Sequence, residues 1–509
     1  MSLMERRYLG PVSAEQDERF EDHFVASIDL TRLLRPQSDL VYGSKGVGKT
    51  ALRRALTELN RDRFYTTKTV NLDKLSFVQV HSALNELGKS SKAEVPSLAR
   101  NMWQNVLALY GLEAVAECLP AQHPLKHRIE ELFQTLEDTD PDPSSRLVAY
   151  IDRLMLRFGE LGLEQSGRAS LGVSRKSIGL LKEFPSDPRV KDLLEETRTL
   201  VVSSGKVVLV CLDGFDEIVD RTALARTAIF AGLIAAIFKS IQDPELSRLF
   251  AFKAFLPQEL TGSAHVMIWD ADKYLRNAHY LRWSEDDFGA FLRKRLLPYA
   301  KTRSPHFLDV WYDFMPDKIR NDEHKIDEPS FNYLLRHTLY RPRQILLHVQ
   351  EILDLWDQRS EKFRVDPSFI PAVVANMNQQ IAQTVVNQLE LDHPGLNAFM
   401  KSWRGHTTTA TVGEFQDRIR RIFGITENHE VYEFFDTLFN FGIFGIAERR
   451  DLTSGSPQAR FRFDYVGDGL TPSVHFSVDE KDIVAFSPMF REFCGCVSSE
   501  FGAIIPVAT

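Results

Sequence analysis

The stretch VYGSKGVGKTALRRAL, residues 41–56, decides the fold of this 509-residue chain. From Gly43 to Thr50 it reads glycine, four further residues, glycine, lysine and threonine, which is the spacing of a phosphate-binding loop, or P-loop. Glycines let such a backbone turn tightly with its N–H groups pointing inward, while Lys49 supplies charge to the outer phosphates and Thr50 offers a hydroxyl to Mg²⁺. The residues expected to hold the nucleotide are Gly43, Ser44, Lys45, Gly46, Val47, Gly48, Lys49, Thr50 and Ala51.

The residues on either side of the loop predict a strand before it and a helix after it. Residues 40–42 form a short apolar run, and the apolar residues that follow the loop recur on one helical face. The N-terminus of that helix would then meet the phosphates. An accidental glycine loop with this spacing arises in roughly a few per hundred chains of this length, and the flanking pattern favours the nucleotide site over it.

A second motif, KVVLVCLDGFDE at residues 206–217, predicts the acidic partner of the loop. Residues 207–212 are apolar and largely β-branched, as in a parallel strand covered on both faces, and Asp213 follows at the end where ligands bind. We expect Asp213 to hold Mg²⁺, and Glu217, or with less support Asp216, to orient or deprotonate a water molecule. A polar turn would explain one aspartate but not three acids. A water-activating acid distinguishes an NTPase from a small-molecule kinase.

The base of the nucleotide is predicted by exclusion. The chain contains no Asn-Lys dipeptide, so the N-K-x-D guanine reader of GTPases is absent. ATP is therefore the expected nucleotide, with Mg²⁺ as its metal ion.

These motifs resemble the STAND and origin-recognition-like branch of AAA-type ATPases, in which a hydrophobic strand ends in D-G-hydrophobic-D-E. The stretch YLGPVSAEQDERFEDHFV, residues 8–25, is similar to the lead-in of a bacterial P-loop ATPase family of that branch. The resemblance implies that the lead-in lines an adenine pocket, with Phe20 and Phe24 as candidates to pack on the base. Core packing is the alternative for each of them.

The predicted fold class is α/β. It has a parallel-sheet P-loop NTPase core with a large α-helical insertion, an α-helical lid and a C-terminal winged-helix-like domain. The expected boundaries are a lead-in at 1–37, the core at 38–284 with its insertion at 76–200, the lid and linker at 285–400, and the last domain at 401–509. Further core strands are expected at 66–75, at 249–256 beside the P-loop strand, and at 279–283.

Two regions are candidates to sense the phosphate. STAND relatives carry an arginine after the strand predicted at 249–256, whereas this chain has Pro257-Gln258, so Gln258, Lys253 or neither serves there. HTLYRPRQILLHVQEIL, residues 337–353, is similar to the sensor-2 region of origin-recognition-like ATPases. Arg341 and Arg343 are its two candidates. Ordinary surface arginines are the alternative, although a helix start is an electrostatically poor place for them.

The last hundred residues predict a different module. Two helices followed by a hairpin of short strands are typical of a winged helix, which binds DNA in many proteins and serves as a protein-interaction or autoinhibitory module in others. The arginines that would contact DNA form two small clusters, Arg418, Arg420 and Arg421, and Arg449 and Arg450. A net charge of -8 and a pI of about 6.0 argue against a generally basic surface.

Composition excludes several other classes of protein. With 43% hydrophobic and 26% charged residues the chain is of ordinary globular composition, and its longest uncharged apolar run, residues 227–238, is short of the roughly 20 residues of a membrane helix. Four cysteines and no secretory signal lead us to expect a cytoplasmic protein. Cys494 and Cys496, and His123 and His127, lack the further ligands of a zinc site.

We therefore expect a slow ATPase that acts as a molecular switch, coupling its ATP or ADP state to self-association or to a protein effector. An ATP-dependent DNA-binding protein of origin-recognition type is the first alternative. A nucleotide-sensing scaffold with negligible turnover is the second.

Overall fold

The computed structural model describes residues 7–26, 28–72, 95–134, 188–215, 223–258, 277–321, 326–390, 393–447, 458–466, 479–499, 501 and 503–507. The chain divides into two compact units. The first, here called the sheet unit, comprises Ala26–Lys45 and Lys49–Tyr280. The other, here called the C-terminal unit, comprises Met1–Val25, Gly46–Gly48 and Leu281–Thr509. None of the described helices is long and apolar enough to cross a membrane.

The sheet unit is built on five parallel strands in the order β2-β3-β4-β1-β5, which confirms the predicted parallel core. The strand before the P-loop is β1, and β4 pairs directly with it, as expected. Residues 73–75 of the predicted second strand lie outside the described residues. The strands are β1 (Asp39–Gly43), β2 (Thr66–Asn71), β3 (Val208–Asp213), β4 (Phe250–Pro257) and β5 (Ala278–Tyr280).

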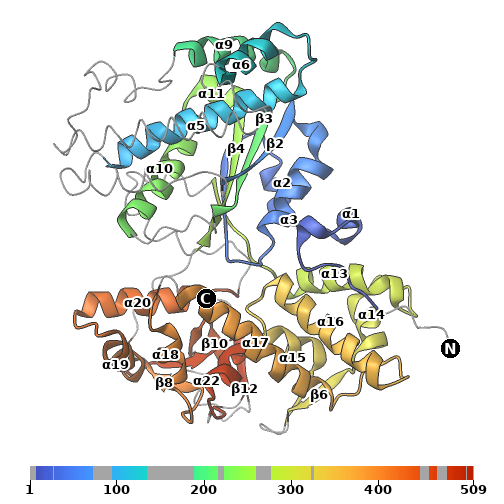
Figure 1. The fold of residues 1–509 in the computed structure, drawn as a ribbon. Coiled ribbons are helices and arrows are strands. Elements are labelled where there is room, and N and C mark those ends of the chain that lie inside the picture. The colour runs from blue at the N-terminus through green and yellow to red at the C-terminus, as the bar shows by residue number, and fades with distance from the viewer. Residues whose placement is uncertain are drawn as a thin grey trace. The chain divides into compact units, whose positions relative to one another are not determined.

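Both faces of this sheet are covered, which explains why its central strands are apolar without alternation. Val208, Val210 and Leu212 of β3 pack in one core with helices α5 (Val95–Cys118) and α10 (Ala223–Gln242). Leu209 and Cys211, which point to the opposite face, are equally buried. Figure 1 shows α5 and α10 on one side of the sheet, with α2 (Ile28–Leu33) and α3 (Lys49–Arg54) on the other.

The described parts of the predicted insertion at 76–200 are helical. They comprise α5, α6 (Pro124–Gln134) and α9 (Pro188–Ser203). Trp103 of α5 donates its indole N–H to the carbonyl of Ile229 in α10 at 2.9 Å, so the two long helices are joined by a polar bond inside the apolar core. The insertion helices therefore belong to the packing of the sheet.

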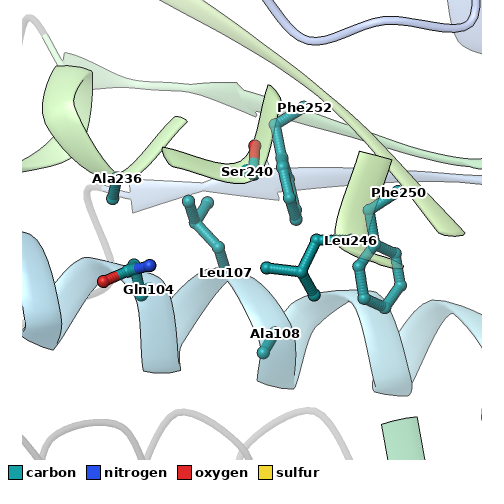
Figure 2. A pocket seen from close by; sticks show the side chains of 8 residues that line it. All are labelled: Gln104, Leu107, Ala108, Ala236, Ser240, Leu246, Phe250 and Phe252. Carbon is teal, nitrogen blue, oxygen red and sulfur yellow. The ribbon is translucent and has the colours of Figure 1, made fainter. Parts of the chain in front are cut away.

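A small cavity lies in this core between α5, α10, α11 (Pro244–Leu249) and the first half of β4 (Figure 2). Its lining is mainly apolar and consists of Gln104, Leu107, Ala108, Ala236, Ser240, Leu246, Phe250 and Phe252. Phe250 and Phe252 belong to the amino-terminal half of β4, whereas ligands of open α/β sheets bind at the carboxyl ends of the strands. The cavity is therefore a packing gap in the core rather than a nucleotide pocket.

In the C-terminal unit, helix α13 starts where the sequence predicts. Ser284 accepts a bond from the Asp287 N–H, and Asp287 accepts one from the Ser284 N–H, which together form a capping box. The helices of this half of the unit are α13 (Glu285–Leu296), α14 (Phe307–Phe314), α15 (Ser330–Arg336), α16 (Pro342–Arg359) and α17 (Ile370–Glu390), with a hairpin of β6 (Lys318–Asn321) and β7 (Ile326–Pro329).

The lead-in segment packs in the same unit through buried charges. Arg295 of α13 donates to the Leu9 carbonyl at 2.9 Å and to Asp17 at 3.4 Å, and Asp17 also pairs with His23 of α1 (Phe20–His23) at 2.9 Å. Further along the unit, Arg7 donates to Asp357 of α16 at 2.9 Å. Residues 7–25 are therefore anchored by partners that lie hundreds of positions later in the chain.

The final module contains the two predicted helices, but its described strands form a five-stranded sheet instead of the predicted hairpin, and residues 473–478 of that hairpin lie outside the described residues. Helices α19 and α20 follow strand β8, and the five-stranded sheet has the order β12-β10-β9-β11-β8. The elements are α18 (Leu396–Lys401), β8 (Thr409–Thr411), α19 (Val412–Phe423), α20 (Asn428–Asn440), β9 (Phe444–Ala447), β10 (Gln458–Arg462), β11 (Ile483–Phe486), α22 (Arg491–Cys494) and β12 (Ala503–Val507).

Candidate nucleotide and metal site

The phosphate loop connects the end of β1 at Gly43 to the start of α3 at Lys49. Gly46 and Gly48 have φ angles of 86° and 111°, a backbone region that favours glycine, so the conformation of the loop explains glycine at these two positions. The buried side chain of Lys49 folds back and donates from Nζ to the Gly43 carbonyl at 2.8 Å. The ammonium group therefore lies over the loop, where phosphate oxygens would accept from it.

Asp213 and Thr50, predicted from separate motifs, lie next to each other. Asp213 ends β3, and its Oδ2 accepts from the Thr50 hydroxyl at 3.3 Å while its Oδ1 accepts from the Gly214 N–H at 2.9 Å. A hydroxyl and a carboxylate are hard oxygen ligands, and Mg²⁺ is usually held by one or two such groups together with phosphates and water. The residues present thus fit a nucleotide-bound Mg²⁺.

A third residue at this place was missed by the sequence analysis. Arg53 of α3 donates from Nε to Asp213 Oδ2 at 3.0 Å and from Nη1 to the Thr69 hydroxyl on β2 at 3.1 Å. The available signal was its spacing: Arg53 follows Thr50 by three positions, which places both on the same helical face. The carboxylate expected to hold the metal therefore has a cation bound to it.

Steric crowding explains why the DGFDE motif has glycine at position 214. Gly214 has a φ of 85°, and a Cβ atom there would overlap the side-chain oxygen of Asn71, whose backbone pairs with Asp213 across β2 and β3. Any other residue at position 214 would push against the strand end that carries Asp213. Asp216 and Glu217, the predicted water-activating acids, lie outside the described residues.

Of the two residues proposed to sense phosphate near β4, Gln258 follows the carboxyl end of the strand and Lys253 lies in its middle. Gln258 directly follows the strand, whose last residue, Pro257, pairs with Gly43 at the start of the phosphate loop. Lys253 pairs in register with Asp39, the first residue of β1. At the usual rise of a strand, this pair lies about 13 Å from the pair of Pro257 and Gly43. The Lys253 ammonium is bound to the Asp39 carboxylate and, at 3.2 Å, to the Arg35 carbonyl. The suggestion that Lys253 senses phosphate is therefore wrong.

The structure separates the two arginines of the predicted sensor-2 region. Within the C-terminal unit, a Cβ atom at Gly46 would lie 3.5 Å from the Cβ of Arg343, whose side chain is exposed. Arg341 instead precedes α16 and is buried. Trp283 of the same unit donates its indole N–H to the Val47 carbonyl at 2.7 Å. Arg343 is thus the arginine beside the loop tip.

We expect Arg343→Ala to reduce ATP turnover at least about tenfold while changing the free energy of unfolding by less than about 0.5 kcal/mol. The matched variant Arg341→Ala is expected to lower the free energy of unfolding by about 1–3 kcal/mol, because it empties a buried position. Phosphate release and urea denaturation of both variants measure this. Equal effects of the two on turnover, with equal stabilities, would contradict the assignment.

The basic cluster predicted on the last module is only partly exposed. Arg418 is buried, donates to the Ser402 carbonyl and stacks 3.9 Å from the ring centre of Trp403, so its inclusion in a cluster that would contact DNA is wrong. Arg420 donates to Asp417 at 2.8 Å, which neutralises part of its charge. Arg449 and Arg450 lie outside the described residues.

Helix α20 is the helix that would enter the major groove if this module docked on DNA like a helix-turn-helix. Its exposed face carries the carboxylates Glu430, Glu433 and Asp436, and residues 428–440 contain no lysine or arginine. Phosphate contacts supply most of the affinity of DNA-binding proteins, and these side chains would repel phosphate. The charge of α20 therefore argues against DNA entry through this helix.

Comparisons with known proteins place the chain beside two solved structures. No family model matches it, and no curated protein matches it. It is similar to the ORC1 protein of Aeropyrum pernix in complex with DNA, with 14% identity, a TM-score of 0.34, and coverage of 88% of this chain and 90% of that chain. It is also similar to the ORC2 protein of Aeropyrum pernix in its ADPNP-ADP complexes, with 10% identity, a TM-score of 0.37, and coverage of 94% and 96%.

Proposed function

We propose that the chain is an ATP-binding and slowly ATP-hydrolysing molecular switch. The observation that carries this proposal is the contact between Thr50, which directly follows the phosphate-loop lysine, and Asp213 at the end of β3, a parallel strand separated from β1 by β4. Thr50 and Asp213 are 163 positions apart in the sequence and meet at one edge of the sheet, as nucleotide and metal binding would need. A glycine-rich loop without function would have no reason to lie beside a strand-end carboxylate.

In this proposal each residue has one task. The N–H groups of residues 43–50 and the ammonium of Lys49 bind the phosphates, and Thr50 and Asp213 hold Mg²⁺, which when bound offsets the phosphate charge. Glu217 takes a proton from, or orients, the attacking water, and Arg343 responds to the presence of the outermost phosphate. The outermost phosphate would add a bond from Arg343, its loss would remove that bond, and this is how hydrolysis becomes a change of conformation.

The output of the switch is proposed to be self-association or binding of a protein effector, as the STAND resemblance implies. The origin-recognition alternative, ATP-dependent DNA binding, would have to use a surface other than the acidic face of α20. The scaffold alternative, with negligible turnover, is favoured by one observation, the ion pair between Arg53 and Asp213, because it opposes metal binding at the catalytic edge.

The test is ATP turnover and nucleotide retention by the wild-type protein and by Glu217→Gln, with Asp216→Asn as the matched control. We expect slow hydrolysis by wild type, a loss of about 100-fold or more in Glu217→Gln with ATP still bound, and near-normal turnover in Asp216→Asn. Particle mass measured with ATP and with ADP then reports self-association. A wild-type protein that retains nucleotide but never hydrolyses it would support the scaffold instead.

A DNA-binding measurement on the same samples distinguishes the origin-recognition alternative from the proposed switch. ATP-dependent binding of a fluorescent duplex, weakening steeply as salt is raised, would favour an origin-recognition type of function. A wild-type protein that binds neither nucleotide nor DNA would refute both.

A further inference from the structure

The bond between Arg53 and Asp213 places a fixed cation at the position where the metal ion is expected to act. Asp213 Oδ2 accepts both from the Thr50 hydroxyl, at 3.3 Å, and from Arg53 Nε, at 3.0 Å. The other carboxylate oxygen accepts from the Gly214 N–H. The oxygen that faces the metal-binding hydroxyl is thus the one that the guanidinium holds.

The guanidinium is held from two sides. While Nε bonds Asp213 on β3, Nη1 bonds the Thr69 hydroxyl on the neighbouring strand β2, and the Arg53 side chain is only 13% exposed. The second anchor keeps the positive charge at this edge even when the carboxylate turns away. A planar fork suits two bonds in different directions, which a lysine ammonium on a flexible stem would not reproduce.

We propose that Arg53 is a positioning residue that competes with the divalent cation for Asp213. The site then binds nucleotide with a weakened dependence on Mg²⁺, and full metal loading requires Arg53 to give up its bond to Oδ2 and remain on Thr69. This inference rests on the proposed nucleotide site. Its chemical basis is repulsion, because a guanidinium within hydrogen-bond distance of a carboxylate opposes the entry of a second cation and, without metal, offsets the repulsion between that carboxylate and phosphate.

The test measures binding rather than turnover. The dissociation constant of a fluorescent ADP is determined in EDTA and across a Mg²⁺ titration for wild type, Arg53→Gln and Arg54→Gln. Arg54 is the matched control, since it loses the same charge from the same helix but pairs with Glu58 away from Asp213. We expect Arg53→Gln to bind several-fold more weakly in EDTA and to need at least about fivefold less Mg²⁺ for half-maximal affinity, whereas Arg54→Gln matches wild type.

Two further variants keep the proposal falsifiable if Arg53→Gln folds poorly. Arg53→Lys keeps the charge but loses the fork, and Thr69→Val removes the second anchor, so each is expected to shift the Mg²⁺ half-point in the same direction by about threefold. A wild type that binds ADP, together with half-points that do not differ among these variants, would overturn the role of Arg53. A wild type that binds no ADP with or without Mg²⁺ would instead refute the proposed function.

Discussion

Lys49→Ala is expected to weaken ATP and ADP binding at least about 100-fold, equivalent to about 2.7 kcal/mol. The Lys49 ammonium lies over the loop and bonds the Gly43 carbonyl at 2.8 Å, so its removal takes away the main point charge available to the phosphates while leaving the glycine backbone in place. Isothermal titration of the purified variant against wild type measures the loss, and ATP turnover should fall to background with it.

The control for this variant is Arg54→Ala, on the same helix. Arg54 pairs with Glu58 one turn later, an exposed ion pair of the kind worth about 0.3–0.5 kcal/mol. Its variant should bind nucleotide as wild type does. If Lys49→Ala retained wild-type affinity, the loop would not be the phosphate site and the proposed function would lose its basis.

Lys253→Met is expected to lower the free energy of unfolding by about 3–5 kcal/mol, because it leaves a buried carboxylate without its cation. Asp39 and Lys253 are both fully buried and form an ion pair between β1 and β4. Asp39 also accepts from Gln37 at 3.1 Å and contacts His279 at 3.2 Å. Urea denaturation followed by circular dichroism measures the change.

The double variant Asp39→Leu with Lys253→Met shows whether the instability of Lys253→Met comes from leaving Asp39 charged without its partner. Replacing both charges by apolar groups of similar size is often neutral, so most of the stability should return. A double variant as unstable as the single one would show that packing, rather than the uncompensated charge, accounts for the loss.

The same pair predicts how stability depends on pH. Burial acts to raise the pKa of Asp39, but the bonds from His279 and Lys253 outweigh it, and the pKa lies below the ordinary value of 3.8. A carboxyl whose pKa is lowered in the folded state contributes stability that is fully present above its unfolded pKa and is lost as the pH falls through the folded pKa. The contribution of Asp39 should therefore be fully present at pH 5, begin to fall only below the ordinary value of 3.8, and be lost as the pH falls through the lowered pKa of the folded state.

The core of the fold was predictable because its signals are local. An apolar run that ends at Gly43 and another that ends at Asp213 each predict a strand with a functional carboxyl end, and parallel packing brings such ends to one edge. The contact of Asp213 with Thr50 follows from that rule. The order of the strands, which decides what stands beside each end, is a long-range property that no single stretch carries.

The roles that could not be predicted from the sequence are those of residues whose contacts depend on this long-range order. Lys253 is the single charge in an apolar strand, and its partner Asp39 is 214 positions away. Only the register of the strands could therefore show that Lys253 forms a structural ion pair. Arg53 needs the positions of both β2 and β3 before its two bonds can be recognised. Arg418 was predicted to belong to a basic cluster that would contact DNA, yet the face of α19 that it shares with Phe415 packs on Trp403.

The anchoring of residues 7–25 by distant partners affects the order in which parts of the chain can fold during translation. Arg7 bonds Asp357 across 350 positions, and Asp17 bonds Arg295 across 278. At about 5–20 residues per second, a ribosome needs about 20 to 70 s to add 350 residues. The five parallel strands are complete by Tyr280, before either anchor has emerged. Residues 7–25 can therefore find these native neighbours only after the parallel sheet has been translated.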